Sequence, residues 1–148
     1  MTANDTPLAL DRPVAMGVVG CGVIGEIYLT NAGRWGALRV AAEADLDAAK
    51  AAARGEQFGV PAVPVEELLA DPAIELVLNL TIPKALAEVA LAAVAAGKAV
   101  YNEKPLAIAL DDGRRLLAAA RAQGVLVGCA PDTFLGGGLQ TCRDLLDA

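Results

Sequence analysis

The sequence predicts an α/β fold in which a doubly wound parallel sheet lies between two layers of helices (α/β/α). Short, continuous apolar segments alternate with helical patterns along most of the chain, and such strands are typical of parallel sheets covered on both faces. The first apolar segment ends in G-x-G-x-x-G, and the second ends in an acidic residue. Right-handed crossovers between consecutive strands then favour the Rossmann topology.

The first third of the chain contains two strand–helix units. We expect residues 1–12 to be a loose leader and residues 13–132 to be a single domain. Uninterrupted apolar runs predict strands over Val14–Gly20 and Leu38–Ala44. Helical patterns predict helices over Val23–Ala32 and Asp47–Phe58.

The middle third continues this alternation. We expect a short extended piece over Val60–Val63, one or two helical turns over Pro64–Ala70 with proline in the first position, and a strand of branched residues over Glu75–Leu80. A helix is expected over Pro83–Ala96, because its apolar residues repeat at helical spacing and Gly97 suits the position after its end.

The last third ends on a helix without a C-terminal cap. Strands over Ala99–Tyr101 and Val125–Cys129 flank a helix over Asp111–Gln123, which has acids in its first turn and arginine in its last. Residues 133–148 are expected to begin a linker helix, from about Gly138, that leads toward a further domain. Its uncapped end is typical of a chain cut within a longer protein, and a frayed natural C-terminus is the alternative.

The fingerprint glycines predict a dinucleotide site. Gly20 permits the tight turn out of the strand, Gly22 has no side chain that would hold a pyrophosphate away from the backbone, and Gly25 lets the helix pack closely on the sheet. The free N–H groups of this loop, which includes Val23 and Ile24, then face the phosphates together with the positive end of the helix dipole. Strand, glycines and helix in this order predict dinucleotide binding.

An acidic residue at the end of the second strand favours NAD over NADP. Asp45 follows Gly25 by 20 residues, which is the spacing of the acid that accepts the hydroxyls of the adenosine ribose and repels a 2′-phosphate. Asp47 is the alternative ribose ligand, in which case Asp45 would only cap the next helix. The position at the end of the apolar run favours Asp45.

Composition limits the class of partner and the compartment. The net charge of −6 and the scattered basic residues argue against nucleic acid. The start of the chain, Met1–Asp5, lacks signal-peptide features, and the longest apolar segment, Ala85–Val100, is too short and too interrupted to span a bilayer. The three cysteines are Cys21, Cys129 and Cys142, and they lack metal-ligand spacing. They fit a reducing, cytoplasmic compartment, no metal site, and small core residues at the first two positions.

Three further segments follow later strands. They are Thr81-Ile82-Pro83, Gly97-Lys98-Ala99-Val100-Tyr101-Asn102-Glu103-Lys104-Pro105-Leu106 and Ala130-Pro131-Asp132-Thr133-Phe134-Leu135-Gly136-Gly137-Gly138. With the fingerprint, the T-x-P and E-K-P motifs in this order resemble the N-terminal half of the glucose–fructose oxidoreductase, inositol dehydrogenase and rhizopine-catabolism (Gfo/Idh/MocA) family, from about Val14 onward. The resemblance implies an NAD(P)-dependent enzyme that oxidises a secondary alcohol of a sugar, polyol or related compound, or reduces the ketone. It also implies a substrate domain, absent from this chain, and a homo-oligomer.

The resemblance assigns roles to several strand-end residues. Lys104, the lysine of E-K-P, would be catalytic: it would orient or polarise the reacting oxygen and help to relay its proton. Thr81 and Glu103 would border the nicotinamide and its ribose, with Asn102 adjacent. Ile82 and Pro83 belong to the same cofactor-binding loop. Without its partner domain, the chain is expected to bind cofactor but to turn over poorly.

Departures from the family pattern leave alternatives open. The chain contains no histidine, and Leu86 and Ala99 stand where the family commonly has one. Proton transfer would therefore rest on Lys104 or on residues outside this chain. A surface lysine held by Glu103 is the alternative for Lys104. The alternative functions are a non-catalytic, redox-sensing or regulatory nucleotide-binding module and an oxidoreductase of another Rossmann family.

The remaining polar motifs have structural explanations. Lys98 is expected to be a charge at a helix C-terminus and nothing more, and Glu66-Glu67 and Asp111-Asp112 are expected to be first-turn acids that complement helix dipoles. The segment Pro131-Asp132-Thr133 either approaches the substrate or forms the hinge to the next domain.

Overall fold

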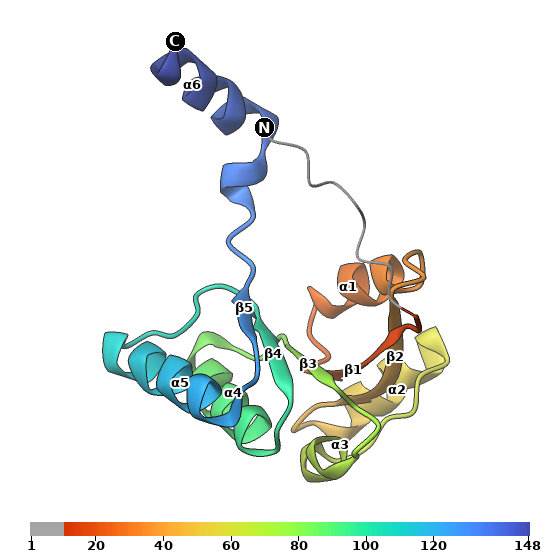
Figure 1. The fold of residues 1–148 in the computed structure, drawn as a ribbon. Coiled ribbons are helices and arrows are strands. Elements are labelled where there is room, and N and C mark those ends of the chain that lie inside the picture. Colours follow the sequence, from red (N-terminus) through yellow and green to blue (C-terminus); the bar gives the residue numbers. More distant parts are fainter. Residues whose placement is uncertain (1–10) are drawn as a thin grey trace.

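The computed structural model describes residues 11–148 as a five-stranded sheet with helices on both faces (Figure 1). The predictions for residues 1–10, a loose leader without a signal peptide, lie outside the described residues. All strands are parallel and lie in the order β2-β1-β3-β4-β5. The strands are β1 (Val14–Val19), β2 (Leu38–Ala44), β3 (Leu76–Asn79), β4 (Ala99–Asn102) and β5 (Val127–Cys129).

The helices between and after these strands confirm the predicted α/β/α layering. In the described part of the chain they are α1 (Gly25–Ala32), α2 (Ala48–Phe58), α3 (Val65–Ala70), α4 (Pro83–Ala95), α5 (Leu110–Gln123), the 3₁₀ helix η1 (Thr133–Leu135) and α6 (Gly137–Asp147). Helices α1 and α2 pack on one face of the sheet, and α3, α4 and α5 pack on the other. None of the described helices is long and apolar enough to cross a bilayer.

Each face of the sheet has its own apolar core, because successive side chains of a strand point to opposite faces. On one face, Val18 of β1 packs with Leu29 of α1, and Phe58 of α2 packs against them. On the other face, Val77 of β3 lies in a larger cluster with Leu116 of α5 and with residues of α3 and α4. Strands β1 and β3 therefore contribute apolar side chains to a core on each face of the sheet.

Several element boundaries differ by one or two residues from the sequence prediction; strand β5, for example, begins at Val127 and not at Val125. Helix α1 begins at Gly25 and not at Val23, because the Gly25 N–H donates to the carbonyl oxygen of Gly22 (3.1 Å) in a turn that precedes the helix. The short extended piece predicted over Val60–Val63 is confirmed, since Ala62 forms an isolated parallel bridge to Glu43 of β2. It is not a strand of its own, and the sheet of the described residues has five strands.

The acidic pairs occupy the predicted positions. Glu66-Glu67 lies in the first turn of α3, and Asp111-Asp112 lies in the first turn of α5. In α5 each aspartate also pairs with an arginine three residues further on, Arg114 or Arg115. These acids therefore support helix ends, as expected from the sequence.

Lys98 contradicts the sequence prediction. It was expected to be a simple charge at a helix end, but its side chain is buried. Its Nζ donates to the carbonyl oxygens of Asp71 (2.6 Å) and Ile74 (2.8 Å) in the loop between α3 and β3. A buried ammonium requires such acceptors, so Lys98 ties the start of β4 to that loop.

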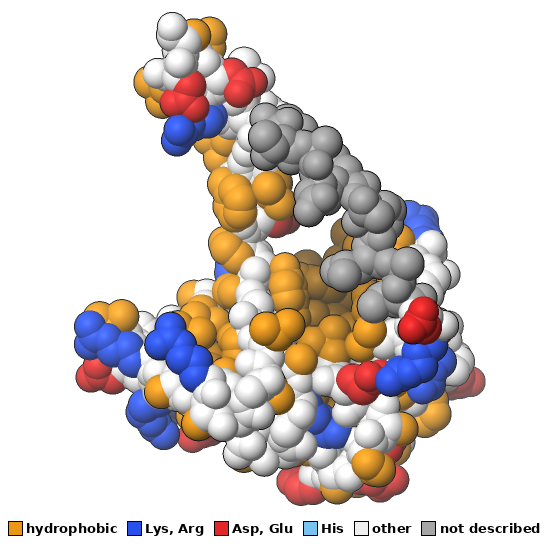
Figure 2. All heavy atoms as spheres, viewed as in Figure 1, with side chains coloured by type: hydrophobic (Ala, Val, Ile, Leu, Met, Phe, Trp, Pro, Cys, Tyr) orange, Lys and Arg blue, Asp and Glu red, His pale blue; other side chains and the backbone are white. Residues whose placement is uncertain are grey.

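One face of the sheet is only partly covered. Helix α1 lies beside β1, whereas the neighbouring part of the same face is an apolar hollow, visible in Figure 2. The segment η1–α6 projects away from the sheet in Figure 1, and every residue from Pro131 to Ala148 is exposed. The helix predicted from about Gly138 is α6, which begins at Gly137.

Candidate functional site

The predicted site residues gather at one edge of the sheet, because the carboxyl ends of parallel strands point the same way. The loop of residues 20–25, which we call the glycine elbow, follows β1. Asp45 follows β2, Thr81 follows β3 and Glu103 follows β4. In the order of the sheet, β2-β1-β3-β4, these loops are neighbours. The tertiary structure therefore assembles four separate segments into one continuous rim.

The glycine elbow contains one glycine that the fold requires and one that it does not. Gly20 has a φ of 107°, and a Cβ there would lie 2.7 Å from the backbone of Leu80, so only glycine fits. Gly22 is exposed, and a Cβ there would meet nothing within 4 Å. A Cβ on Gly25 would lie 3.5 Å from the Gly20 carbonyl oxygen, an ordinary contact. The open space at Gly22 therefore suits a molecule that approaches from outside.

The backbone donors of this elbow are free. In the described part of the chain, the N–H groups of Gly22, Val23 and Ile24 have no protein acceptor. They lie at the N-terminus of α1, where the helix dipole is positive. Together these groups form a place where an anion would be stabilised.

Asp45 is held beside the elbow. Its Oδ2 accepts a hydrogen bond from the Cys21 N–H (2.8 Å), and its Oδ1 accepts one from the Asp47 N–H (2.9 Å). Asp47 itself caps α2, since its Oδ1 accepts from the N–H groups of Ala49 (3.1 Å) and Lys50 (3.3 Å). The two aspartates thus have different surroundings: Asp45 contacts the elbow, and the Asp47 carboxylate is occupied by the helix.

Three large apolar side chains are exposed along the same rim. Val23 in the elbow is 94% exposed, Leu46 after β2 is 97% exposed, and Ile82 after β3 is 69% exposed. Apolar side chains grouped on a rim without protein neighbours indicate a surface that contacts a ligand. Leu46 was not predicted from the sequence, although its position directly after the strand-end acid could have indicated it.

A buried pair of amides supports the loops after β3 and β4. The Asn79 Nδ2 donates to the Asn102 Oδ1 (3.0 Å) and to the Leu86 carbonyl oxygen (2.9 Å). The Asn79 Oδ1 accepts from the Thr81 hydroxyl (2.7 Å), and the Asn102 Nδ2 donates to the Leu106 carbonyl oxygen (3.1 Å). Both asparagines are fully buried. The side chain of Asn102, expected to lie next to the cofactor, therefore lies beneath the loop, and the supporting role of Asn79 was missed.

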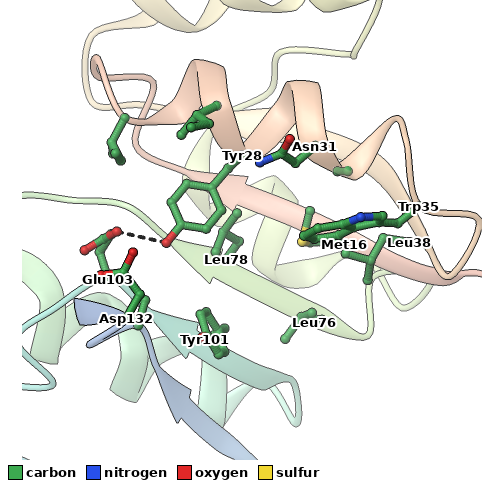
Figure 3. A pocket seen from close by; sticks show the side chains of 14 residues that line it. Met16, Tyr28, Asn31, Trp35, Leu38, Leu76, Leu78, Tyr101, Glu103 and Asp132 are labelled. Carbon is green, nitrogen blue, oxygen red and sulfur yellow. Dashed lines mark hydrogen bonds between the residues drawn. The ribbon is translucent and has the colours of Figure 1, made fainter. Parts of the chain in front are cut away.

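The E-K-P segment is tied to α1 across the sheet. The Tyr28 hydroxyl donates to the Glu103 Oε1 (2.8 Å), as Figure 3 shows, and the Glu103 Oε2 accepts from the Lys104 N–H (2.7 Å). Both carboxylate oxygens of Glu103 are thus engaged without the Lys104 ammonium. The Lys104 side chain is exposed and forms no ion pair within residues 11–148. Glu103 therefore holds the backbone N–H of Lys104, and not its ammonium group as the alternative interpretation expects.

The hollow beside α1 is a cleft of about 470 Å³, which we call the α1 cleft. Tyr28, Trp35 and Tyr101 contribute aromatic rings, and Glu103 and Asp132 lie together at its polar end (Figure 3). Burial raises the pKa of Tyr28 far above its ordinary value, and the hydrogen bond to Glu103 raises it further. Tyr28 is therefore a protonated donor at all physiological pH values.

Two of the three cysteines are unsuited to act as nucleophiles. Cys21 is buried, Cys129 is half-buried, and Cys142 is exposed on α6. Burial raises the pKa of Cys21 to about 12, with further contributions from Glu43 and Asp45, and burial also raises the pKa of Cys129. Since the thiolate is the reactive form, Cys21 and Cys129 are packing residues. No group of three or more acidic, cysteine or histidine side chains within residues 11–148 could hold a metal ion.

Comparison with protein families gives a match over most of the chain. The family model described as "Oxidoreductase family, NAD-binding Rossmann fold" (GFO_IDH_MocA) matches residues 14–130. The chain is 35% identical over 114 residues to 1,5-anhydro-D-fructose reductase of Ensifer adhaerens, which covers 76% of this chain and 34% of that protein. It is 36% identical over 115 residues to inositol 2-dehydrogenase of Agrobacterium fabrum, covering 75% of this chain and 34% of that protein. The chain thus spans about a third of the length of these relatives.

Solved structures include similar domains. Biliverdin reductase from Synechocystis, in complex with biliverdin and NADP⁺, superposes with a TM-score of 0.85 at 32% identity, over 91% of this chain and 43% of that one. KijD10, a 3-ketoreductase from Actinomadura kijaniata in complex with NADP and TDP-benzene, gives a TM-score of 0.83 at 30% identity, over 92% of this chain and 42% of that one. GenD2 from gentamicin A biosynthesis, in complex with NAD, shares the fold with a TM-score of 0.85 at 24% identity, over 90% of this chain and 39% of that one.

Proposed function

This chain belongs to the Gfo/Idh/MocA oxidoreductase family with an NAD-binding Rossmann fold, and on that premise we propose that it is the NAD-binding half of a sugar or polyol oxidoreductase. The complete enzyme would transfer hydride between the nicotinamide C4 and a secondary alcohol or ketone. The two sequence relatives named above are an inositol 2-dehydrogenase and a 1,5-anhydro-D-fructose reductase. No observation favours the alternative of a non-catalytic module.

The observation that carries this proposal is the glycine elbow. Free N–H groups of Gly22, Val23 and Ile24 surround a space that no protein atom fills. A pyrophosphate would accept these donors at the positive end of α1. The neighbouring carboxylate of Asp45 would accept the hydroxyls of the adenosine ribose, and exposed Leu46 would lie against the adenine.

The choice of NAD over NADP rests on Asp45. Its carboxylate is held at the elbow by the Cys21 N–H, so a 2′-phosphate on the ribose would meet a fixed negative charge. Two structural relatives above 25% identity were solved with NADP, which makes the preference of this chain an experimental question. We propose NAD because the repulsion acts at the atom that distinguishes the two cofactors.

The reacting end of the cofactor would lie near the loops after β3 and β4. We assign Thr81, Ile82, Pro83 and Glu103 to the surroundings of the nicotinamide and its ribose, and Asn102 to the support beneath them. The exposed Lys104 ammonium would hydrogen-bond the reacting oxygen and stabilise its negative charge. Because the chain has no histidine, any imidazole acid or base would come from outside these 148 residues.

The wider setting is proposed on general grounds. The net charge of −6 supports a small-molecule ligand and not nucleic acid. The free cysteines support a reducing cytoplasmic compartment. The open apolar α1 cleft supports burial against further protein, either the substrate domain or a second subunit.

A single alanine tests the proposed cofactor site. Gly22→Ala should fold with an unchanged melting temperature, because a Cβ there meets nothing within 4 Å. It should lower NADH affinity about tenfold or more, since the methyl group would occupy the space of the pyrophosphate. The matched control is Gly36→Ala, also in open space but away from the elbow, which should bind normally. Calorimetry that shows no NADH binding to the wild type, or equal binding to Gly22→Ala, would refute the site.

A second pair of variants tests cofactor choice. Asp45→Ser should weaken NAD binding and shift the NAD/NADP affinity ratio about tenfold toward NADP, because the fixed charge is lost. Asp47→Ser should leave that ratio unchanged, since serine also caps helices. If instead Asp47→Ser shifts the ratio and Asp45→Ser does not, Asp47 is the ribose ligand.

A further inference from the structure

We propose that Tyr28 is a positioning residue, whose hydroxyl holds Glu103, and with it the loop that carries Lys104, against helix α1. The inference rests on the proposed cofactor site and adds a link between its two ends. Helix α1 presents the phosphate-binding donors at its N-terminus, and the Glu103–Lys104 segment lies at the proposed nicotinamide end. Tyr28 is the described side chain that joins them by a hydrogen bond.

The geometry of the link is specific. Tyr28 and Glu103 are 75 positions apart in sequence, yet the hydroxyl and Oε1 lie 2.8 Å apart. Figure 3 shows the tyrosine reaching from α1 across the α1 cleft to Glu103. The second carboxylate oxygen is held by the Lys104 N–H at 2.7 Å. Glu103 is therefore fixed at both oxygens, one by its own loop and one by α1.

The surroundings make this hydrogen bond effective. Tyr28 and Glu103 are both half-buried, and a hydrogen bond to a charged acceptor that is partly shielded from water is stronger than an exposed one. The Tyr28 ring also packs against the core cluster beneath α1, which restricts the hydroxyl to one position. The Tyr28 side chain is therefore held in one orientation by its packing and by its hydrogen bond to Glu103.

The link predicts a selective effect on ligand binding. Loss of the hydroxyl frees the Glu103 carboxylate and its loop but leaves the elbow, the α1 donors and Asp45 in place. NADH contacts both ends of the site, whereas ADP has the adenosine and the phosphates but lacks both the nicotinamide and its ribose. A positioning role of Tyr28 thus affects NADH binding more than ADP binding.

The experiment compares both ligands on the 148-residue chain by calorimetry. Tyr28→Phe should lower NADH affinity about three- to tenfold and leave ADP affinity within about twofold. Tyr101→Phe is the matched control, because Tyr101 lines the same cleft and its hydroxyl donates to no acceptor within the described residues. It should leave both affinities unchanged.

A double-mutant cycle separates positioning from general structural damage. In a Glu103→Ala background, Tyr28→Phe should have no further effect on the ratio of NADH affinity to ADP affinity, since its partner is gone. An equal loss of affinity for both ligands, or a full additional effect in the Glu103→Ala background, would overturn the proposal. If the wild type binds both ligands and Tyr28→Phe is identical to it, only this inference fails; if the wild type binds neither, the proposed function fails as well.

Discussion

A carboxylate buried without a partner among the described residues should make the stability of this domain fall as the pH rises from about 4.5 to about 7. Glu43 on β2 is 0% exposed, and neither of its carboxylate oxygens has a hydrogen-bond partner within the described residues. The side chain lies against α2, where a Cβ on Gly55 would be 3.3 Å from Oε1. Burial raises the pKa of Glu43 to about 7, and the charge of Arg54 only partly opposes this. The decisive variant is Glu43→Gln, which keeps the shape and removes the titration.

The sign and size follow from linkage between protonation and folding. Because the pKa is about 7 in the folded chain and near 4.5 when the group is solvated, the folded state binds more protons between these values. The contribution of Glu43 to the free energy of unfolding is therefore most favourable below about pH 4.5, and it decreases as the pH rises to about 7. The full loss above pH 7 is about 3 kcal/mol, or about 6–12 °C in melting temperature for a domain of this size.

The assay is urea or thermal unfolding of the wild type and Glu43→Gln between pH 5 and pH 8.5. The two should have similar free energies of unfolding at pH 5, where Glu43 is protonated, and Glu43→Gln should be more stable at pH 8.5 by up to about 3 kcal/mol. Glu56→Gln on the exposed face of α2 is the control and should follow the wild type. Parallel curves for the wild type and Glu43→Gln would show that Glu43 does not ionise within this range, and the argument from burial would be wrong.

Two further variants test how the layers are held together. Lys98→Met should lower the free energy of unfolding by about 2–3 kcal/mol, because the carbonyl oxygens of Asp71 and Ile74 lose a charged donor; a loss below 0.5 kcal/mol in urea unfolding would contradict this. Gly17→Ala should cost about 1–3 kcal/mol, since a Cβ there would lie 2.7 Å from the buried Leu68 side chain, and an unchanged urea midpoint would show that α3 moves aside freely.

The layered fold could be predicted because its signals are local. Apolar runs such as Val14–Val19 and Leu76–Asn79 indicate buried strands, and residues such as Asp47 and Gly97 mark helix ends through their own backbone and side-chain chemistry. The start of α1 was misplaced by two residues, because the turn that ends at Gly25 depends on a hydrogen bond to Gly22 and not on apolar spacing.

The site was predicted less completely than the fold, for a physical reason. The residues that would touch a ligand stand in recognisable motifs, but the residues that hold them do not. Asn79 bonds to Asn102, 23 positions away, and Tyr28 bonds to Glu103, 75 positions away. Nothing in the local sequence of Asn79 or Tyr28 indicates these partners. Asn102 stands in a motif, yet its burial depends on packing beneath the loop.

The alternation of strands and helices, the glycine elbow and the acid that follows the second strand could be predicted from the residues alone, because each depends on neighbours a few positions away. The three-dimensional arrangement was needed to show which aspartate faces the elbow, that Lys98 is buried, that Glu43 has no hydrogen-bond partner within residues 11–148 and that Tyr28 contacts Glu103. These features depend on which segments the parallel sheet brings side by side. They form only when the crossover connections bring residues that are distant in sequence within hydrogen-bonding distance.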